Sequence, residues 1–569
     1  MISEDTFDIV IVGGGHNGIT AAAYLAKCGL SVCVLEERPE VGGAQENAEP
    51  MAGVRIDPCA TYLYGALAPG FEQLELWKYG FRMAWNPMVV LLRDESARRA
   101  GGGNLTTEGV VPLTEKDIQG WNTLCGLGTK YPFLKDLLRA VYWCPPHPAE
   151  VEVTEQNIPY MQVLREKAPE VYSDNIPNMT MFDLMDEFLE TESNKTMQGF
   201  LAWYSGAAPH WEGMAIPALA GALSFSVVSG LSAPRGGMHQ YAHSIVRSAL
   251  AHGARVLTCC PVEEIVVQNG RAQGVRLRDD AARAGKFVWA RKAVLSDVPV
   301  QATFLKLIGP EHTDVSFRQR IKDISLKGGS IYVTHFLFRD PPRFRPKFAA
   351  ARGGVPADNI AYPVDSREIL LQHMADVDAR KSTPNLDPDK LMWIAVGAKM
   401  NDSTNVTVPG YLVSPFYIMV PPPEYHVGGP DAVNKVKEQM NAAAIRGYSQ
   451  VAENIDSDNI IGFWANSPYD SELRNTGLIA GNWYSTRHCS DQWAERRPLP
   501  ELARYRTPID GLYLCHQTSH PGGLCLMAVP YNLMHILIED GIAQPGPWWY
   551  PSPYYIPERG KISAAPTSS

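Results

Sequence analysis

The first apolar runs of the chain predict a strand, a helix and a second strand in close succession. Ile9 to Val12 is a short apolar run, and Ile19 to Lys27 consists of residues that favour helices. Ser31 to Leu35 is again apolar and strand-like. A strand–helix–strand unit at this spacing is typical of the first part of a nucleotide-binding α/β domain.

Two later regions continue the alternation of helices and strands. In 234–277 a Gly-Gly pair precedes a helix with apolar residues at helical spacing, followed by a strand around Val256 and two strands joined by Asn269-Gly270. Near the C-terminal end, a strand over Leu512 to Cys515 leads into a His-Pro-Gly-Gly turn and a further helix. These regions predict that one sheet is built from separate parts of the chain.

The stretches between these regions have a different character. The segment 66–225 is helix-rich, with predicted helices over 181–189 and 194–204. The segment 311–474 contains strand-like runs at 331–338, 392–396 and 417–420. These two stretches are therefore predicted to differ in structure from the strand–helix–strand regions.

The turn after the first strand carries a glycine pattern with a defined chemistry. Gly13, Gly15 and Gly18 match G-x-G-x-x-G, in which the glycines allow a tight turn, close approach to a pyrophosphate and close packing of helix on strand. Glu36 ends the second strand, where a carboxylate accepts hydrogen bonds from ribose hydroxyls and disfavours a 2′-phosphate. The sequence therefore predicts a dinucleotide site without preference for NADP.

The amino-acid composition narrows the classes of function and the cellular location that the sequence allows. The chain has 569 residues, 45% of them hydrophobic, which indicates a folded protein of two or three domains. Its net charge of −10 excludes a basic nucleic-acid-binding surface. Its 10 cysteines show no paired C-x-x-C motifs, so no zinc site is expected, and the first strand begins without a preceding signal peptide. These features predict a cytoplasmic protein.

One uncharged stretch has two interpretations. Residues 213–233 contain no charged residue and reach the length of a membrane span. They also include Pro217 and several glycines and serines. The first interpretation is a buried helix or cavity wall. The second is a substrate entry that makes peripheral contact with a membrane.

The residues after the second strand identify a family resemblance. The run "ERPEVGGAQE" (37–46) places a second glycine pair after the acidic strand end and resembles the phytoene desaturase-like FAD flavoproteins of the glutathione-reductase-like amine oxidase superfamily. This resemblance implies that Glu36 holds the adenosine ribose, that Arg38 lies by the adenosine or its phosphate and that Gly43 approaches the pyrophosphate. The usual arginine after the glycines is Ala44 here, so backbone N–H groups would replace one pyrophosphate contact.

The resemblance extends to the later segments. It implies that Val262 meets the adenine through its backbone. The His-Pro-Gly-Gly turn resembles the C-terminal flavin motif of the family, in which the turn and the next helix face the flavin, which here means Gly523 and Leu524. The family usually continues with further glycines, but this chain has larger residues and Pro530, which fits a helix only within its first turn.

The resemblance also implies a fold class, α/β, and a domain plan. A discontinuous Rossmann-type FAD-binding domain would comprise residues 1–65, 226–310 and 475–541. An α+β substrate region would comprise a helical insertion (66–225) and a mixed sheet (311–474). Residues 542–569 would form an aromatic, Pro-rich tail whose aromatic part packs on the body or on a partner subunit and whose last residues are disordered.

The family resemblance implies a reaction class with several forms. A bound FAD would accept hydride from an allylic C–H of an apolar, terpenoid-like substrate, giving desaturation or, with water, allylic hydroxylation. The alternatives are a flavin amine oxidase and a catalytically silent subunit that supports a homologous partner. The electron acceptor can be oxygen, a quinone or an electron carrier. The sequence does not determine the oligomeric state or the direction of reaction.

Three residues near the C-terminal motif are candidates for catalysis. His516 and His520 flank the predicted flavin turn, and Tyr531 follows Pro530. A neutral histidine can take up a proton or orient a water molecule. For His520 the sequence allows a second interpretation, a backbone hydrogen bond that only shapes the turn.

Overall fold

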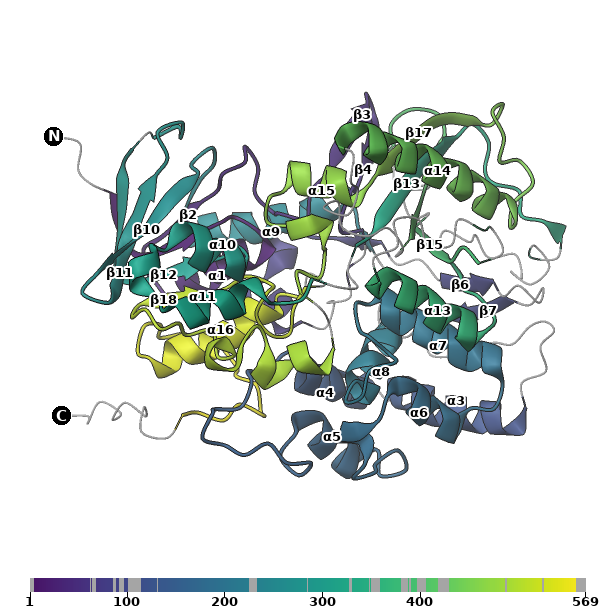
Figure 1. The fold of residues 1–569 in the computed structure, drawn as a ribbon, viewed down its shortest axis with the longest axis horizontal. Coiled ribbons are helices and arrows are strands. Elements are labelled where there is room, and N and C mark those ends of the chain that lie inside the picture. Colours follow the sequence, from purple (N-terminus) through teal and green to yellow (C-terminus); the bar gives the residue numbers. More distant parts are fainter. Residues whose placement is uncertain are drawn as a thin grey trace.

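A computed structural model gives the fold of the chain. It describes residues 5–558 except 62, 64–67, 85–87, 92–96, 101–113, 130, 225–232, 284, 327–329, 347, 349–358, 380–386, 388–389, 397–405, 418–428, 487–488 and 524–525. Two seven-stranded sheets lie side by side, one toward each end of the molecule, with most helices below and around them (Figure 1).

The first sheet gathers strands from three distant parts of the chain. Its order is β10-β11-β12-β1-β2-β9, and β18 pairs with β12. β1 is parallel to both β2 and β12, β2 is parallel to β9, and β12 is parallel to β18. The bounds are β1 Asp5–Val12, β2 Val32–Leu35, β9 Arg255–Leu257, β10 Val262–Gln268, β11 Arg271–Leu277, β12 Phe287–Ser296 and β18 Leu512–Leu514.

The sequence patterns of this sheet follow from its burial. Every residue of β2 is buried, as expected for a parallel strand that is covered on both faces. Helix α1 (His16–Lys27) packs against α9 (Met238–Ala251) and α16 (Ala528–Glu539) on one face. Asn269 and Gly270 both have positive φ, 52° and 75°, so the β10–β11 connection has the predicted hairpin turn.

The second sheet is mostly antiparallel and has the order β17-β13-β16-β15-β14-β6-β7. β6 and β7 come from the stretch predicted to be helix-rich, and β6 pairs with β14 in parallel. Residues of α14 (Gly429–Ser449) join the aromatic core of this sheet. The bounds are β6 Met88–Leu91, β7 Ala97–Ala100, β13 Tyr332–Phe338, β14 Asn359–Tyr362, β15 Trp393–Val396, β16 Tyr411–Tyr417 and β17 Ile460–Asn466.

The predicted strands of the second sheet are found with shifted ends. The runs predicted at 331–338 and 392–396 correspond to β13 and β15. The run predicted at 417–420 overlaps β16 at Tyr417, and its other residues, 418–420, lie outside the described part of the chain. The register of β16 is set by pairing with β13, a long-range contact that the local pattern does not contain.

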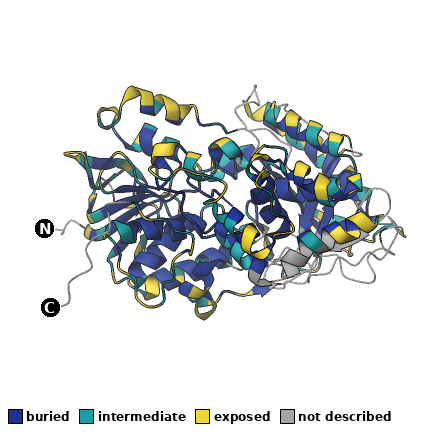
Figure 2. Cartoon of the chain, turned by 90° about the horizontal axis from the view of Figure 1, so that it is seen from below, coloured by how far each residue is buried: buried dark blue, intermediate teal, exposed yellow. Residues whose placement is uncertain are grey.

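A helical layer lies below the second sheet (Figure 1). Buried residues fill the interior of the molecule, and exposed residues lie on outer helices and loops (Figure 2). The helices predicted at 181–189 and 194–204 are α6 and α7. The layer comprises α3 Glu115–Thr129, α4 Tyr131–Val141, α5 Pro159–Lys167, α6 Met181–Phe188, α7 Glu192–Tyr204, α8 Ala215–Leu223 and α13 Arg367–Asp378. The remaining shorter elements include β3 Ala48–Met51, β4 Val54–Ile56, β5 Met83–Ala84, β8 Ala233–Pro234, α2 Pro69–Gln73, α10 Val300–Ala302, α11 Val315–Lys322 and α15 Pro468–Arg474.

The uncharged stretch 213–233 contains the short helix α8, all of whose residues are buried. Residues 225–232 of this stretch lie outside the described residues. Among the helices that the structure describes, none is both long and apolar enough to cross a membrane. The described part of the stretch is thus a buried helix, the first of the two interpretations.

The aromatic part of the tail packs on the body of the protein. Trp548 stacks on Tyr24 of α1 with ring centroids 6.1 Å apart, and Lys27 lies 5.1 Å from the Trp548 ring. The Tyr550 carbonyl accepts hydrogen bonds from Gln73 (3.2 Å) and Tyr531 (3.1 Å). This confirms the expected packing on the body; residues 559–569, predicted to be disordered, are outside the described part.

Candidate functional site

The glycine turn between β1 and α1 has the close contacts that the motif predicts. Gly13 has φ of 96°, and a Cβ added there would lie 2.6 Å from the Asp297 carbonyl oxygen. A Cβ on Gly18 would lie 2.4 Å from the Gly13 carbonyl oxygen. Side chains at these positions would therefore force β1, β12 and the start of α1 apart.

Glu36 follows β2 directly and is buried beside this turn. Its Oε2 accepts a hydrogen bond from Gly14 N (2.7 Å), and its Oε1 accepts one from Arg38 N (2.8 Å). Burial raises the pKa of Glu36, while the two backbone donors act in the opposite direction. The carboxylate thus shapes the loop as well as facing the space where a ribose would bind.

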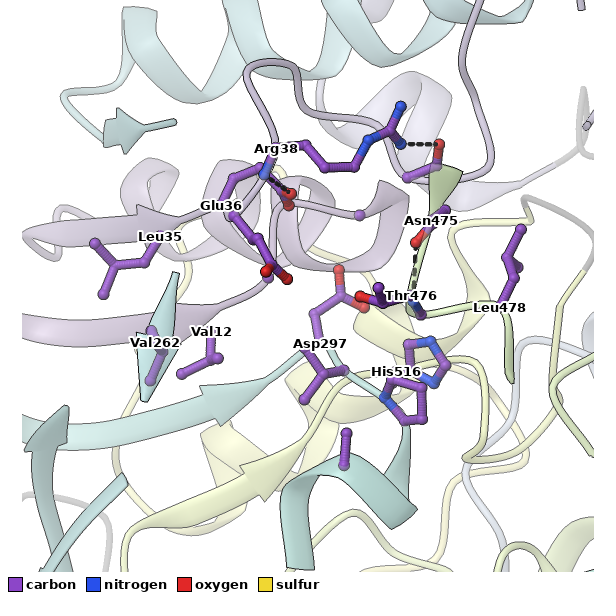
Figure 3. Close-up of a pocket in the computed structure, with 18 of the residues that line it drawn as sticks. Val12, Leu35, Glu36, Arg38, Val262, Asp297, Asn475, Thr476, Leu478 and His516 are labelled. Atoms are coloured by element: carbon purple, nitrogen blue, oxygen red, sulfur yellow. Dashed lines mark hydrogen bonds between the residues drawn. The ribbon is translucent and has the colours of Figure 1, made fainter. Parts of the chain in front are cut away.

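A cavity of about 430 Å³ runs along the carboxyl ends of the parallel strands of the first sheet. It reaches from Val262 at the start of β10 to His516 just beyond β18, and the Glu36 and Asp297 carboxyl groups point into it from different strands (Figure 3). The predicted site residues that line this cavity are Gly13, Gly15, Glu36, Arg38, Gly43, Ala44, Val262 and His516.

Two other predicted cofactor residues, Gly18 and Gly523, are not among the residues that line this cavity. Gly18 lies behind it, in the packing of α1 on β1. Gly523 is packed against Gln517 and the Trp483 carbonyl, since a Cβ added to it would lie 3.1 and 3.2 Å from their oxygen atoms. Leu524 lies outside the described residues.

His520 makes a structural contact in the turn. Its Nδ1 accepts a hydrogen bond from Ala494 N (3.2 Å), its ring meets the edge of Trp493 at 5.0 Å, and its carbonyl accepts from the Tyr505 hydroxyl (2.7 Å). Burial lowers the pKa of His520 to about 3. These contacts match the interpretation in which His520 shapes the turn by a backbone hydrogen bond.

Tyr531 faces the tail in this structure. Its hydroxyl donates to the Tyr550 carbonyl, and its ring lies 4.9 Å from His535 and 5.1 Å from Trp549. Helix α16 begins at Ala528, so Pro530 lies in the first turn, where a missing N–H costs no helical hydrogen bond. Pro530 thus lies where the sequence analysis said that a helix could accept it.

His516 lies at the far end of the cavity from Val262 and is neutral. Its Nδ1 accepts from Thr518 N (3.2 Å), and burial together with the nearby His16 and Arg497 lowers its pKa to about 3. His16, at the start of α1, lines the same cavity, and burial lowers its pKa to about 4. Two uncharged imidazoles thus border the end of the cavity where the resemblance implies the flavin.

Arg38 lines the cavity, but carboxylates and carbonyls already hold its guanidinium. One Nη lies 2.5 Å from the buried Glu46 carboxylate and the other 3.4 Å from the Gly43 carbonyl oxygen. Arg278, also on the cavity wall, pairs with Glu37 (3.0 Å) and Asp280 (2.7 Å). Lys306 lines the cavity and forms no ion pair with any residue that the structure describes.

Sequence reasoning missed several cavity residues. They are His16, Asn17, Asp297, Lys306, Asn475, Thr476 and Gln517. Asp297 follows β12 directly, and the end of a parallel strand beside a glycine turn was an available signal. Asn475 and Thr476 come from the segment after α15, and no local pattern marks them as neighbours of Gly43.

The cavity residues fit a dinucleotide. The Asn17 side-chain Nδ2 is buried and has no hydrogen-bond partner among the described residues, although it is an amide donor on the cavity wall. With the glycine turn and Glu36, Asn17 can hold pyrophosphate and ribose, so the lining of this cavity fits FAD.

Comparison with known proteins agrees with this geometry. Residues 11–74 match the model of the family described as NAD(P)-binding Rossmann-like domain. The chain is 27% identical to pyridine nucleotide-disulfide oxidoreductase domain-containing protein 2 of Rattus norvegicus and 24% identical to a subunit of limonene dehydrogenase of Castellaniella defragrans, over 94% of both chains in each case. It is 26% identical to hydroxyneurosporene desaturase of Cereibacter sphaeroides over 62% of this chain and 70% of that protein.

A solved structure supports the fold. Putrescine oxidase superposes with a TM-score of 0.54 and 16% identity, covering 94% of this chain and 99% of that chain. The likeness shows an amine oxidase-like architecture with a Rossmann-type domain and a second, mixed sheet. The chain is thus an FAD-dependent oxidoreductase that is similar in sequence to the phytoene and hydroxyneurosporene desaturases and similar in fold to putrescine oxidase.

Proposed function

We propose that this protein removes hydride from an allylic C–H bond of an apolar, terpenoid-like molecule. The observation that carries the proposal is the match over 94% of both chains with a limonene dehydrogenase subunit, whose named substrate is an apolar hydrocarbon. The hydroxyneurosporene desaturase and phytoene desaturase relatives are named for substrates of the same kind. These similarities favour an isoprenoid over an amine.

Each part of the cavity has a separate task in this proposal. Gly13, Gly15 and Gly43 allow close backbone approach to the pyrophosphate, and Glu36 accepts hydrogen bonds from the adenosine ribose. The bound FAD would supply a hydride acceptor at its flavin ring. Val262, at the opposite end from His516, would contact the adenine through its backbone.

The chain's contribution near the reacting carbon is mainly shape and exclusion of water. His516 is buried and neutral, with Nδ1 accepting from Thr518 N, so Nε2 carries the imidazole proton. In that tautomer His516 can donate a hydrogen bond at Nε2 but offers no free acceptor. We therefore propose that His516 orients a group at the flavin end and is not the base that takes the second proton in a desaturation.

A second function is supported by one observation. The relative from Castellaniella defragrans is named a subunit, so a homologous chain assembles with another polypeptide. The glycine-poor run after Gly523 is consistent with a chain that supports a partner flavoprotein. The substrate side would then be shared, or provided by the partner.

The first test is an absorbance spectrum of the purified protein, alone and co-expressed with a homologue, followed by anaerobic titration. We expect a flavin spectrum that is bleached by monoterpenes or linear carotenoid precursors and not by putrescine or cyclohexylamine. Bleaching by amines alone would replace the proposal with an amine oxidase. A colourless, folded protein that turns yellow only with its homologue would support the subunit function instead.

A further inference from the structure

Asp297 occupies an unusual position for a carboxyl group. It follows β12 directly, is buried, and its Oδ2 accepts a hydrogen bond from Gly18 N at 2.7 Å. Its main-chain N donates to the Val12 carbonyl at 2.7 Å, which fixes it at the end of β1. The side chain therefore reaches across the glycine turn and holds the first turn of α1.

The same carboxyl group lies at the place where the motif puts the pyrophosphate. It lines the cavity beside Gly13 and Gly15, and a Cβ added to Gly15 would lie 2.7 Å from its Oδ2 (Figure 3). The glycine turn and the start of α1 favour negative charge, and Asp297 already uses one of the N–H groups there. A dianionic pyrophosphate would have to bind next to this carboxyl group.

The titratable groups nearest to Asp297 do not offset its charge. Glu36, at the end of β2, and Cys515, just after β18, interact electrostatically with it, and both are acidic groups. His16 of α1 and His516 line the same cavity as neutral imidazoles. A carboxylate at this position would therefore add to the negative charge that a pyrophosphate brings.

The cations of the cavity wall do not pair with Asp297 in the described part of the chain. Carboxylates hold Arg38 and Arg278. Lys306 lines the cavity as well, where it is available to the pyrophosphate. Protonation of Asp297 is then the remaining way to remove its charge beside a bound dinucleotide.

We propose that Asp297 is a positioning residue that is a neutral carboxylic acid when FAD is bound, so that dinucleotide binding is linked to its protonation. Oδ2 would keep accepting from Gly18 N, while the protonated carboxyl donates its O–H to a phosphate oxygen. If the Asp297 carboxyl group is ionised in the empty site, it takes up one proton from solvent when FAD binds. Burial already raises the pKa of Asp297 in the empty site, in agreement with this arrangement.

The proposal rests on FAD binding and not on the identity of the substrate, so its test uses FAD affinity and spectroscopy of the holoprotein. Infrared difference spectra of holo wild type and Asp297→Asn should show the C=O stretch of a protonated carboxyl in the wild type that the variant lacks. A carboxylate signal in its place overturns the proposal.

Affinity measurements separate positioning from charge. FAD binding is measured by quenching of flavin fluorescence between pH 6 and 9. Asp297→Asn, which keeps an acceptor for Gly18 N and carries no charge, should bind FAD within threefold of the wild type at pH 6 and at least as tightly at pH 9. Asp297→Ala, which removes the contact with α1, should bind at least tenfold more weakly at both.

Two results would overturn the inference. If Asp297→Asn bound FAD more than tenfold more weakly than the wild type throughout this range, a charged carboxylate would be required. If Asp297→Ala bound as tightly as Asp297→Asn, the side chain would not position the turn. Neither result depends on turnover, so failure of the terpenoid proposal would leave this test intact.

Discussion

The two sheets of this protein differ in how tightly each position constrains its residue. In the first sheet, the glycines of the turn and Glu36 contact backbone atoms closely. A Cβ on Gly18, for example, would lie 2.4 Å from the Gly13 carbonyl oxygen. In the second sheet, the close neighbours are side chains, such as the aromatic rings around Phe336. Backbone contacts accept one residue type, whereas side-chain packing accepts many combinations of similar volume.

This difference explains why function divides between the sheets. A cofactor shared by a family needs the same backbone approach in every member, which the glycine turn provides. The substrate side can change its side chains while its sheet stays intact. The comparison predicts that substitutions in the core of the second sheet lower stability without weakening FAD binding. Substitutions at the glycine turn and Glu36 of the first sheet should mainly weaken FAD binding.

The largest expected effect is in the core of the second sheet. Phe336 is buried, and its ring lies 4.8 Å from Phe463 and 5.8 Å from Tyr448. Phe336→Ala should lower the free energy of unfolding by about 3–5 kcal/mol, because it removes buried area and leaves a cavity. Urea unfolding measures this, and the FAD dissociation constant of the folded fraction should stay within twofold. A tenfold loss of FAD affinity would contradict the separation of the two regions.

The next effect is on the first sheet. Glu36→Arg should weaken FAD binding by roughly 100-fold, since it removes a ribose acceptor and the acceptor of the Gly14 and Arg38 N–H groups, at about 1.5–3 kcal/mol for each charged hydrogen bond. Flavin retained after gel filtration gives the measurement. Glu170→Arg, at an exposed position that does not line the cavity, is the matched control and should keep its flavin. Undiminished flavin in Glu36→Arg would show that the ribose lies elsewhere.

The apoprotein should lose stability as pH falls from 7 to 5. Burial lowers the pKa of His16 and His535 to about 4 and of His516 and His520 to about 3. The unfolded histidines bind protons below about pH 6.5 and the folded ones do not, so each favours unfolding by about 2 kcal/mol at pH 5. Asp297 and Glu36, whose pKa values are raised by burial, act in the opposite direction, and we expect the histidines to outweigh them.

Thermal unfolding at several pH values tests this sign. The melting temperature should fall between pH 7 and pH 5, and His535→Gln, which lies away from the cavity, should flatten the slope. His252→Gln, at the half-buried C-terminal end of α9, is the control. A melting temperature that rises toward pH 5 would mean that the carboxyl groups outweigh the histidines.

The smallest effect concerns charge at the cofactor site. Because Ala44 replaces the usual arginine, Lys306 should provide part of the positive charge for the pyrophosphate, and Lys306→Met should weaken FAD binding about 3–10-fold. The loss should appear for ADP and be absent for adenosine, which lacks phosphates. Lys322→Met, on the exposed face of α11, is the control. Equal losses for ADP and adenosine would place Lys306 at the adenine end.

Much of the first sheet could be predicted from the sequence because its signals are local. The glycine spacing, the acidic strand end and the Asn269-Gly270 turn each require a backbone conformation that few residues adopt, and the structure contains all three. Sequence reasoning also recognised that Pro530 fits a helix only within its first turn, and α16 begins at Ala528. Sequence reasoning did not find that β16 begins at Tyr411, because the register of this strand comes from its pairing with β13.

The sequence alone determined the dinucleotide turn and the residues that line its near wall, since these rest on short-range rules of backbone geometry. The choice of FAD and the reaction class were implied by the family resemblance. Only the tertiary structure decided which distant residues complete the site. It brought Asp297 to Gly18, Asn475 to Gly43 and His16 toward His516, and it turned Tyr531 toward the tail. These neighbours come from separate strands and loops, and their meeting depends on the packing of the whole chain, which no local pattern records.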